Sequence, residues 1–404
     1  MATACFVCTG PVDEFLDLGQ QPLSDAFPAP GDDLSQEYFF RLAVGRCAAC
    51  WMTQLVEVPP TERMFHQSYP YRTSGSAVMR EHFARTAERL LARRRDPFTV
   101  EIGSNDGVFL GVAAARGLRH LGVDPSGDAG ADAVARGVRV RVDFFTEEVA
   151  REVRTEHGPA DLVFSANTIS HDPEINSILR GVAALLAPDG EFVFEDPYLG
   201  AVLTNTAFDQ IIDEHVLFFS ARSVVTMLAQ AGLELVDVER LPVHGGQIRF
   251  TAAHRGSRSA APSVAALLAE EQVIGLHDTA LLASFAARTE RRRDDLVALL
   301  RGLRSEGARI VAYGATAKSA TVANYCGLGP DLVSAVIDTT PAKQGRLTPG
   351  THIPVEPPEA FGPGKADYAL MFAWNHAEEI MAKERAFSEA GGRWVFYVPE
   401  VRVV

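Results

Sequence analysis

Residues 99–110 read TVEIGSNDGVFL, a short apolar run followed by a glycine-flanked turn and a second apolar run. This order is typical of a buried strand that passes through a tight turn into a helix, the first unit of a doubly wound α/β sheet. Gly103 and Gly107 allow the backbone of the turn to approach a bound ligand closely. We therefore expect the middle of the chain to form a Rossmann-like, cofactor-binding domain.

The residues around this turn distinguish between two kinds of cofactor. A dinucleotide fold carries a GxGxxG motif, which GSNDG does not match. An acid two residues before the first glycine is instead typical of S-adenosylmethionine-binding domains. The next predicted strand, HLGVDPS, ends near an acid that can accept hydrogen bonds from ribose hydroxyls. We therefore expect the cofactor at Glu101, Gly103, Asn105, Asp106, Gly107 and Asp124.

Strand and helix patterns alternate from residue 97 to about residue 250, as in a doubly wound sheet. VDFFTEE (residues 142–148) and DLVFSANTISHDPE (residues 161–174) read as the ends of its third and fourth strands. Ligands in such sheets bind beyond the carboxyl ends of the strands. We therefore expect Asp143, Asn167 and His171 at the cofactor and substrate cleft.

A candidate proton acceptor follows the fifth predicted strand. Residues 208–220 read FDQIIDEHVLFFS, in which Glu214 and His215 are adjacent. Such a dipeptide is more often a surface feature, but its position in a cofactor domain makes the surface and the catalytic interpretation about equally good. Histidine suits proton abstraction at neutral pH because its unperturbed pKa is about 6.5.

Two CxxC pairs, Cys5 with Cys8 and Cys47 with Cys50, bracket the first fifty residues. In a reducing compartment such pairs are better metal ligands than disulfides. Four thiolates leave no open position for water on a tetrahedral zinc ion, so we expect a structural zinc rather than a catalytic one. Unmetallated thiols or a redox pair are the alternative, since the 38 residues between the pairs exceed the usual zinc-ribbon loop.

A second α/β unit follows a long amphipathic helical stretch at residues 263–304. ARIVAYGATAKSATVANYCGL (residues 308–328) reads as strand, glycine turn and helix, and the next strand ends in Asp338. Lys318 falls near the amino terminus of the predicted helix, where backbone N–H groups and an ammonium can both receive a phosphate. Diphosphate binding and a purely scaffolding Rossmann repeat explain this unit equally well.

The composition excludes several classes of function. The chain has 404 residues, 47% of them hydrophobic, which is enough for two or three domains with buried cores. A formal charge of −14 argues against a general nucleic-acid partner, whose affinity comes from phosphate neutralisation. The sequence lacks a run of 18 apolar residues, and MATACFVCTG lacks the basic and apolar regions of a secretion signal. We expect a cytoplasmic monomer without membrane contact.

The motifs occur in an informative order: CxxC twice, YxYxxSGS, EIGSNDG, ANTISHxP, DEHVLFFS, HGGQIRF, YGATAKSATVANY and IDTTPAKQGRLTPGTHIPV. Across nearly the whole chain this order resembles the zinc-containing, three-domain sugar C-methyltransferases of deoxysugar biosynthesis. Those enzymes use S-adenosylmethionine to methylate carbon 3 or carbon 5 of a nucleotide-linked 4-keto-deoxyhexose. The resemblance implies a zinc-binding domain at 1–62, a class I methyltransferase domain at 63–252 and a nucleotide-sugar-binding, Rossmann-like domain at 253–404.

The resemblance also implies roles for single residues. It makes His215 the base that removes a hydrogen next to the ketone and Glu214 its partner, while His171, Tyr69 and Tyr71 line the sugar. It implies a thymidine diphosphate (dTDP) sugar as the substrate, in natural-product and antibiotic biosynthesis. The residues expected to hold this substrate are Tyr198, Lys318, Asn324, Asp338 and Lys343.

The match departs from the family at one place. Family members usually read YHEH where this chain has Ile212-Asp213-Glu214-His215, so a tyrosine assigned to the sugar site is missing. Tyr198 or Tyr69 is expected to supply the lost hydroxyl unless the acceptor differs. Two alternatives therefore stay open: a C-methyltransferase of a non-sugar enolisable acceptor, and a non-catalytic relative that binds a nucleotide sugar. The complete cofactor turn argues against the second, and the GATAKS turn is no dinucleotide fingerprint for a dehydrogenase.

Overall fold

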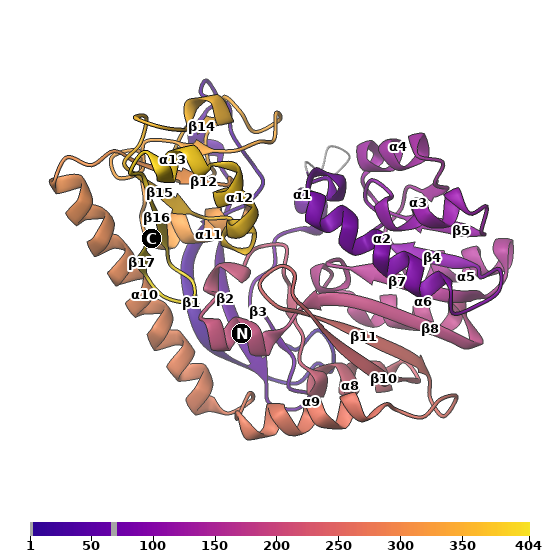
Figure 1. Cartoon of the computed structure of the whole chain (residues 1–404). Coiled ribbons are helices and arrows are strands. Elements are labelled where there is room, and N and C mark those ends of the chain that lie inside the picture. Colours follow the sequence, from indigo (N-terminus) through magenta and orange to yellow (C-terminus); the bar gives the residue numbers. More distant parts are fainter. Residues whose placement is uncertain (1–2, 66–70) are drawn as a thin grey trace.

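The computed structural model describes residues 3–65 and 71–404, which form three β-sheets surrounded by helices (Figure 1). The predicted zinc ligands accompany the N-terminal sheet, the predicted cofactor turn belongs to the middle sheet, and the second predicted α/β unit forms the C-terminal sheet. Among the described residues, no helix combines the length and the apolar character that a membrane span requires.

The N-terminal sheet is antiparallel and has the strand order β1-β2-β3-β9. Its last strand comes from the middle of the chain, directly after His215, so the candidate base lies where two parts of the protein join. The strands are β1 (Val12–Pro22), β2 (Phe39–Cys47), β3 (Thr53–Leu55) and β9 (Leu217–Phe218). Short helices accompany them at η1 (Leu34–Gln36), α1 (Thr61–Met64) and η2 (Thr73–Gly75).

The middle sheet has the strand order β10-β11-β8-β7-β4-β5-β6. From β8 to β6 all neighbours are parallel, whereas β11 lies antiparallel between β8 and β10. The strands are β4 (Thr99–Ile102), β5 (His120–Val123), β6 (Val140–Arg141), β7 (Ala160–Ala166), β8 (Leu186–Pro197), β10 (Leu233–Leu241) and β11 (Gln247–His254). This order confirms the Rossmann-like domain predicted from the sequence.

Helices cover both faces of the middle sheet. Along β7, Leu162 and Phe164 belong to one hydrophobic cluster and Val163 to another, because successive side chains of a strand point to opposite faces. The helices are α2 (Ala77–Leu91), α3 (Val108–Ala115), α4 (Gly127–Ala135), α5 (Glu147–His157), η3 (Ile169–His171), α6 (Ile175–Leu185), α7 (Leu199–Asn205), η4 (Phe208–Gln210) and α8 (Ala221–Gln230).

The predicted helical stretch after the middle sheet is broken into α9 (Pro262–Val273) and α10 (Thr279–Ser305). The break occurs at Gly275, whose φ of +64° ends the first helix in a left-handed conformation that glycine adopts without strain. Helix α10 then runs for 27 residues along the outside of the molecule to the C-terminal part of the chain (Figure 1).

The C-terminal sheet has the order β14-β13-β12-β15-β16-β17 and is parallel except for β17. Its strands are β12 (Ile310–Tyr313), β13 (Val336–Ile337), β14 (Val355–Glu356), β15 (Tyr368–Met371), β16 (Arg393–Phe396) and β17 (Arg402–Val403). Its helices are α11 (Ala317–Tyr325), η5 (Pro358–Ala360), η6 (Trp374–His376), α12 (Ala377–Lys383) and α13 (Arg385–Glu389). The second α/β unit predicted from the sequence is therefore present.

The segment after β1 contacts both other parts of the molecule. The Ser24 backbone N–H donates to Asp213 Oδ2 at 3.0 Å, and Asp25 pairs with Lys343 at 2.9 Å. The N-terminal sheet lies between the two larger domains in Figure 1. The first contact fixes the loop that carries His215 against the N-terminal part, and the second joins the N-terminal and C-terminal parts.

Candidate active site

A cavity of about 400 Å³ lies where the three parts meet. The turn after β4 contributes Gly103 and Asn105, and Asp124 follows β5. The C-terminal sheet contributes Lys318, from the first turn of α11, and Asp338 after β13. The carboxyl ends of both parallel sheets therefore open into one space, the usual place for ligands in such folds.

The cofactor turn requires its first glycine. Gly103 has a φ of +73°, and a Cβ added there would lie 2.2 Å from Thr168 Oγ1. Gly107, at the start of α3, has a φ of +78°, and its Cβ would lie 2.9 Å from Ala133 Cβ. Of the two glycines only Gly103 lines the cavity, whereas Gly107 allows the start of α3 to pack closely against Ala133.

Asp124 combines backbone hydrogen bonds with exposure to the cavity. Its Oδ2 accepts from the Asn105 N–H at 2.7 Å, and its Oδ1 accepts from the Ser126 N–H at 2.8 Å. Burial raises the pKa of this carboxyl. Each oxygen keeps a second lone pair, so the group can also accept a bond from a ribose hydroxyl. These features fit S-adenosylmethionine.

Three other residues predicted at the cofactor lie behind the cavity wall. Glu101 is 6% exposed and does not line the cavity. Its pKa is raised well above the usual range, mainly by burial and secondly by the charge of Asp124. Asp106 forms an ion pair with Arg136 at 2.9 Å. Asp143 pairs with Arg141 at 2.9 Å outside the cavity. They support the turn and the neighbouring strand.

Aromatic residues at the third strand end were missed by the sequence analysis. Strand β6 contains two residues only, and the chain after it places Phe144 and Phe145 against the cavity, where Asp143 was expected. The sequence feature that could have indicated these two residues is the FF pair itself, because two apolar residues directly follow a short strand. Asn167 does line the cavity as expected, and its Oδ1 accepts a hydrogen bond from Gln247.

His215 is buried to 9% exposure and lines the cavity. Its Nδ1 lies 2.7 Å from the Gln210 carbonyl oxygen. A carbonyl can only accept, so this bond assigns the proton to Nδ1 and leaves the Nε2 lone pair available. Burial and, to a smaller extent, the charge of Lys318 together lower the pKa of the ring to about 4, although the hydrogen bond to Gln210 opposes the shift. The imidazole is therefore neutral at pH 7, as a base must be.

His171 is held in a stack of three rings. It lies parallel to Phe65, with ring centres 5.4 Å apart, and against His215, with ring centres 5.3 Å apart. Its Nε2 is buried without a hydrogen-bond partner among the described residues. Glu214 lines the same cavity, and so does Tyr71, which is 45% exposed. Tyr69 lies outside the described residues.

The two departures from the family pattern have different environments. Ile212 lines the cavity, so an aliphatic side chain occupies the site. Asp213 points to the N-terminal part, accepts the bond from Ser24, and has a pKa raised to about 6 by burial. Tyr198 does not replace the missing hydroxyl, because it lies away from the cavity and donates to Glu271 Oε1 at 3.2 Å.

Of the four residues of the C-terminal part that were predicted to hold the substrate, three line the cavity and one does not. Lys318, Asp338 and Lys343 line the cavity as expected. Asn324 lies outside it and donates to the carbonyl oxygens of Ala320 and Pro349 at 2.8 and 3.1 Å. This correction follows from its position near the end of α11, about two turns away from the helix end that meets the cavity.

Two histidines were also missed. His244, in the HGG turn before β11, and His376, at the end of η6, both line the cavity. The HGGQIRF motif had drawn attention to the turn, but nothing in the spacing of the sequence connects it with residue 376. Only the docking of the C-terminal domain on the middle domain brings the two together.

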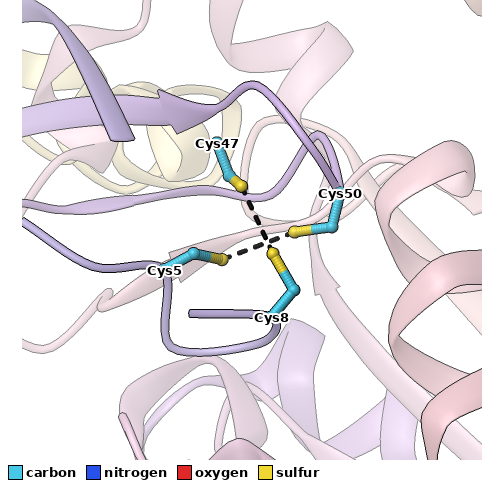
Figure 2. A group of neighbouring side chains, drawn as sticks. All are labelled: Cys5, Cys8, Cys47 and Cys50. Carbon is cyan, nitrogen blue, oxygen red and sulfur yellow. Dashed lines mark hydrogen bonds between the residues drawn. The ribbon is translucent and has the colours of Figure 1, made fainter. Parts of the chain in front are cut away.

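The four paired cysteines form one cluster (Figure 2). Their sulfur atoms lie within 4.8 Å of one another, with Cys5 and Cys50 at 3.4 Å and Cys8 and Cys47 at 3.4 Å. A tetrahedral zinc site with Zn–S bonds of about 2.3 Å has S–S edges of about 3.8 Å. The cluster therefore fits a zinc ion held by four thiolates, with no position left for water.

Each of the three parts of the chain matches a known protein family. Family models match in order: a zinc-binding domain at residues 5–65, a methyltransferase domain at 76–238 and a C-methyltransferase C-terminal domain at 242–399. The chain is 39% identical over 407 residues to C-methyltransferase NovU of Streptomyces niveus, and the alignment covers 99% of this chain and 96% of NovU.

Solved structures resemble part of the chain. Magnesium protoporphyrin IX methyltransferase of Synechocystis, with bound S-adenosylmethionine, is 12% identical with a TM-score of 0.33, covering 43% of this chain and 79% of that chain. An S-adenosylmethionine-dependent methyltransferase of Anabaena variabilis is 16% identical with a TM-score of 0.36, covering 45% of this chain and 86% of that chain.

Proposed function

Because this chain belongs to the zinc-binding, S-adenosylmethionine-dependent C-methyltransferases, we propose that it methylates the carbon next to the ketone of a nucleotide-linked 4-keto-deoxysugar. We propose thymidine diphosphate as the nucleotide. The observation that carries the proposal is a neutral His215 in a cavity shared by the cofactor turn and the C-terminal nucleotide-binding unit. S-adenosylmethionine supplies a methyl group on a positively charged sulfur.

In this proposal His215 removes the proton next to the ketone. Its Nδ1–H is held by the Gln210 carbonyl, so Nε2 accepts the proton from carbon. The carbonyl fixes the plane of the ring and accepts a stronger hydrogen bond once the ring is charged. Glu214 lines the same cavity, and its carboxylate favours the imidazolium that forms. With S-adenosylmethionine bound, its methyl group would pass to the resulting carbanion as the sulfur–methyl bond breaks, and neutral S-adenosylhomocysteine would be left.

The ketone oxygen gains negative charge as the proton leaves, and it needs hydrogen-bond donors. Tyr71 supports this role because it lines the cavity and because a phenol, whose ordinary pKa is about 10, is protonated at neutral pH and can donate. His171 is the second candidate, since its Nε2 has no hydrogen-bond partner among the described residues and its ring is fixed between Phe65 and His215. We propose that these two groups face the sugar.

A nucleotide on the substrate is supported by a second strand end that resembles the cofactor site. Asp338 accepts from the Ala315 N–H and the Thr340 N–H, both at 2.7 Å. Asp124 accepts in the same manner from the N–H of Asn105, in the turn after the neighbouring strand β4, and from the N–H of Ser126, two residues after Asp124 itself. We propose that Asp338 faces the nucleoside of the substrate as Asp124 faces that of the cofactor.

Ile212 favours a second candidate, transfer to a non-sugar enolisable acceptor, because its side chain puts hydrocarbon where the family has a phenol. A screen by mass spectrometry distinguishes the two. Nucleotide-linked keto sugars and simple keto acids are each incubated with S-adenosylmethionine and the protein, and a gain of one methylene identifies the acceptor. Methylation of keto acids alone would refute the sugar assignment.

Replacement of the base tests the mechanism. His215→Asn is expected to keep cofactor affinity and to lose about 10²–10⁴-fold of turnover, the usual contribution of a positioned base. With S-adenosylhomocysteine bound, the variant is also expected to lose exchange of the acidic substrate hydrogen for deuterium, which reports proton removal without methyl transfer. Glu214→Gln is expected to lose less. Near-normal turnover in His215→Asn would place the base elsewhere, with His171 the next candidate.

A further inference from the structure

A lysine and two histidines meet on one wall of the cavity. Lys318 extends from the first turn of α11, His244 from the HGG turn of the middle domain and His376 from η6. The Lys318 ammonium lies 5.5 Å from the centre of the Trp374 ring, and the two histidine rings contact edge to face with centres 6.2 Å apart. We name Lys318, His244 and His376 the cationic wall.

Among the described residues, the ammonium of Lys318 has no carboxylate in direct contact. Its Nζ is buried and makes no hydrogen bond to any described residue. Burial lowers the pKa of Lys318, and the carboxylate of Asp209 opposes this shift from a distance. Asp209 itself is fully buried and accepts from Trp374 Nε1 at 2.6 Å and from the Tyr397 hydroxyl at 2.7 Å. Burying an unpaired ammonium costs free energy, and an anionic ligand in the cavity would lower this cost by pairing with Lys318.

The second lysine of the cavity provides the contrast. Lys343 Nζ pairs with Asp25 at 2.9 Å and donates to the Ala315 carbonyl at 2.9 Å. Its charge is therefore neutralised by a group of the protein. Lys318 alone of the two presents uncompensated charge, although both line the same cavity.

Two further features of this wall favour an anion. The helix α11 directs its amino end, with Thr316 and Ala317, to the cavity, and helix amino termini attract negative charge. Burial and the charge of Lys318 keep the pKa values of His244 and His376 below their usual range. Both rings are therefore neutral at pH 7 and each offers one N–H donor, while an approaching dianion would favour their protonation.

We propose that the cationic wall binds a phosphate group of the substrate, and that Lys343 does not. This assignment rests on the proposed function, because a nucleotide-linked substrate supplies the diphosphate. The site joins two sheets: His244 lies in the turn before β11 of the middle sheet, whereas Lys318 and His376 lie on α11 and η6, beside the C-terminal sheet. A bound phosphate therefore fixes these two parts relative to each other.

Calorimetry of the full-length protein with inorganic pyrophosphate and with thymidine diphosphate tests the proposal. Lys318→Met is expected to weaken pyrophosphate binding about 10- to 100-fold, since a charge-assisted contact is lost. Lys318→Arg, which restores the charge, is expected to recover most of the affinity. His376→Asn and His244→Asn are expected to weaken binding less, and asparagine suits position 244 because its φ is +49°.

Two controls separate a contact from a change in net charge. Lys365→Met removes the same charge from an exposed position outside the cavity and is expected to leave pyrophosphate affinity within about threefold of the native value. The double variant Asp25→Asn with Lys343→Met removes the neutral pair as a unit, and a loss of pyrophosphate affinity as large as that of Lys318→Met would assign the phosphate to Lys343 instead. Thermal melting with each variant confirms that the fold is kept.

The outcomes distinguish this site from the proposed function. Pyrophosphate binding that depends on Lys318, in a protein that methylates no nucleotide sugar, would refute the substrate assignment and leave the anion site standing. Methylation of a nucleotide sugar with unchanged pyrophosphate binding in Lys318→Met would overturn the anion site alone. The same holds if Lys318→Met loses deuterium exchange yet keeps pyrophosphate affinity, because Lys318 would then act on the ketone oxygen. Absence of pyrophosphate and thymidine diphosphate binding to the native protein would also overturn it.

Discussion

The acid side of the pH profile tests the environment of His215. A base must be neutral to accept a proton, so kcat/KM rises with pH through the pKa of the free enzyme and then levels off. Burial holds the pKa of His215 at about 4. At pH 5.5 roughly 97% of such rings are neutral, against about one tenth for a histidine at the ordinary pKa of about 6.5. We therefore expect kcat/KM at pH 5.5 to stay close to its value at pH 7.5.

The assay measures methyl transfer by mass spectrometry from pH 4.5 to pH 8, with thermal melting at each pH to confirm that the protein remains folded. Asp213 needs a control because its pKa is raised to about 6 and it lies two residues before His215. Asp213→Asn keeps an acceptor for the Ser24 N–H and removes this titration. A tenfold loss of kcat/KM by pH 5.5 in both proteins would refute the neutral, buried base.

Three further predictions concern the metal, the cofactor and the backbone. The protein is expected to carry about one zinc per chain by metal analysis; Cys47→Ser should lose zinc and lower the melting temperature, while Cys326→Ser, which changes a buried cysteine outside the cluster, should keep the metal. Asp124→Ala is expected to weaken S-adenosylhomocysteine binding by about 1.5–3 kcal/mol in calorimetry, and Asp143→Ala, outside the cavity, should leave it unchanged. Gly103→Ala should abolish cofactor binding and destabilise the fold in denaturant titrations, because its Cβ would lie 2.2 Å from a threonine hydroxyl at a φ of +73°; normal binding in this variant would contradict the tight turn.

The sequence predicted best what local spacing determines. Each CxxC pair is one turn, and the glycine turn with Asp124 belongs to one strand-turn-helix-strand unit, so these residues were found without tertiary information. Glu101 and Asp106 were predicted at the cofactor but do not line the cavity, because a motif does not distinguish the residues that support a turn from those that face the cavity. The domain boundaries and the monomeric, cytoplasmic state stay predictions.

Residues from different domains were the harder part. His244 and His376 are 132 positions apart in the sequence, and no pattern of either segment indicates that they meet. Tyr198 was expected to supply the hydroxyl that the family pattern has at the position of Ile212, but its hydroxyl donates to Glu271 of α9 instead. Such placements depend on how the domains dock, which sequence periodicity does not encode.

Gln210 connects the base with the cationic wall. Its backbone carbonyl accepts from His215, and its side-chain Nε2 donates to the His244 carbonyl at 2.8 Å. The charge of Lys318 also disfavours protonation of His215. In the proposed assignment, a phosphate on Lys318 cancels that charge and makes the imidazole a stronger base. A sugar without its nucleotide would bring no phosphate to Lys318, so it would react slowly even when it occupies the cavity. The diphosphate undergoes no bond change in the reaction, yet it would increase the basicity of His215.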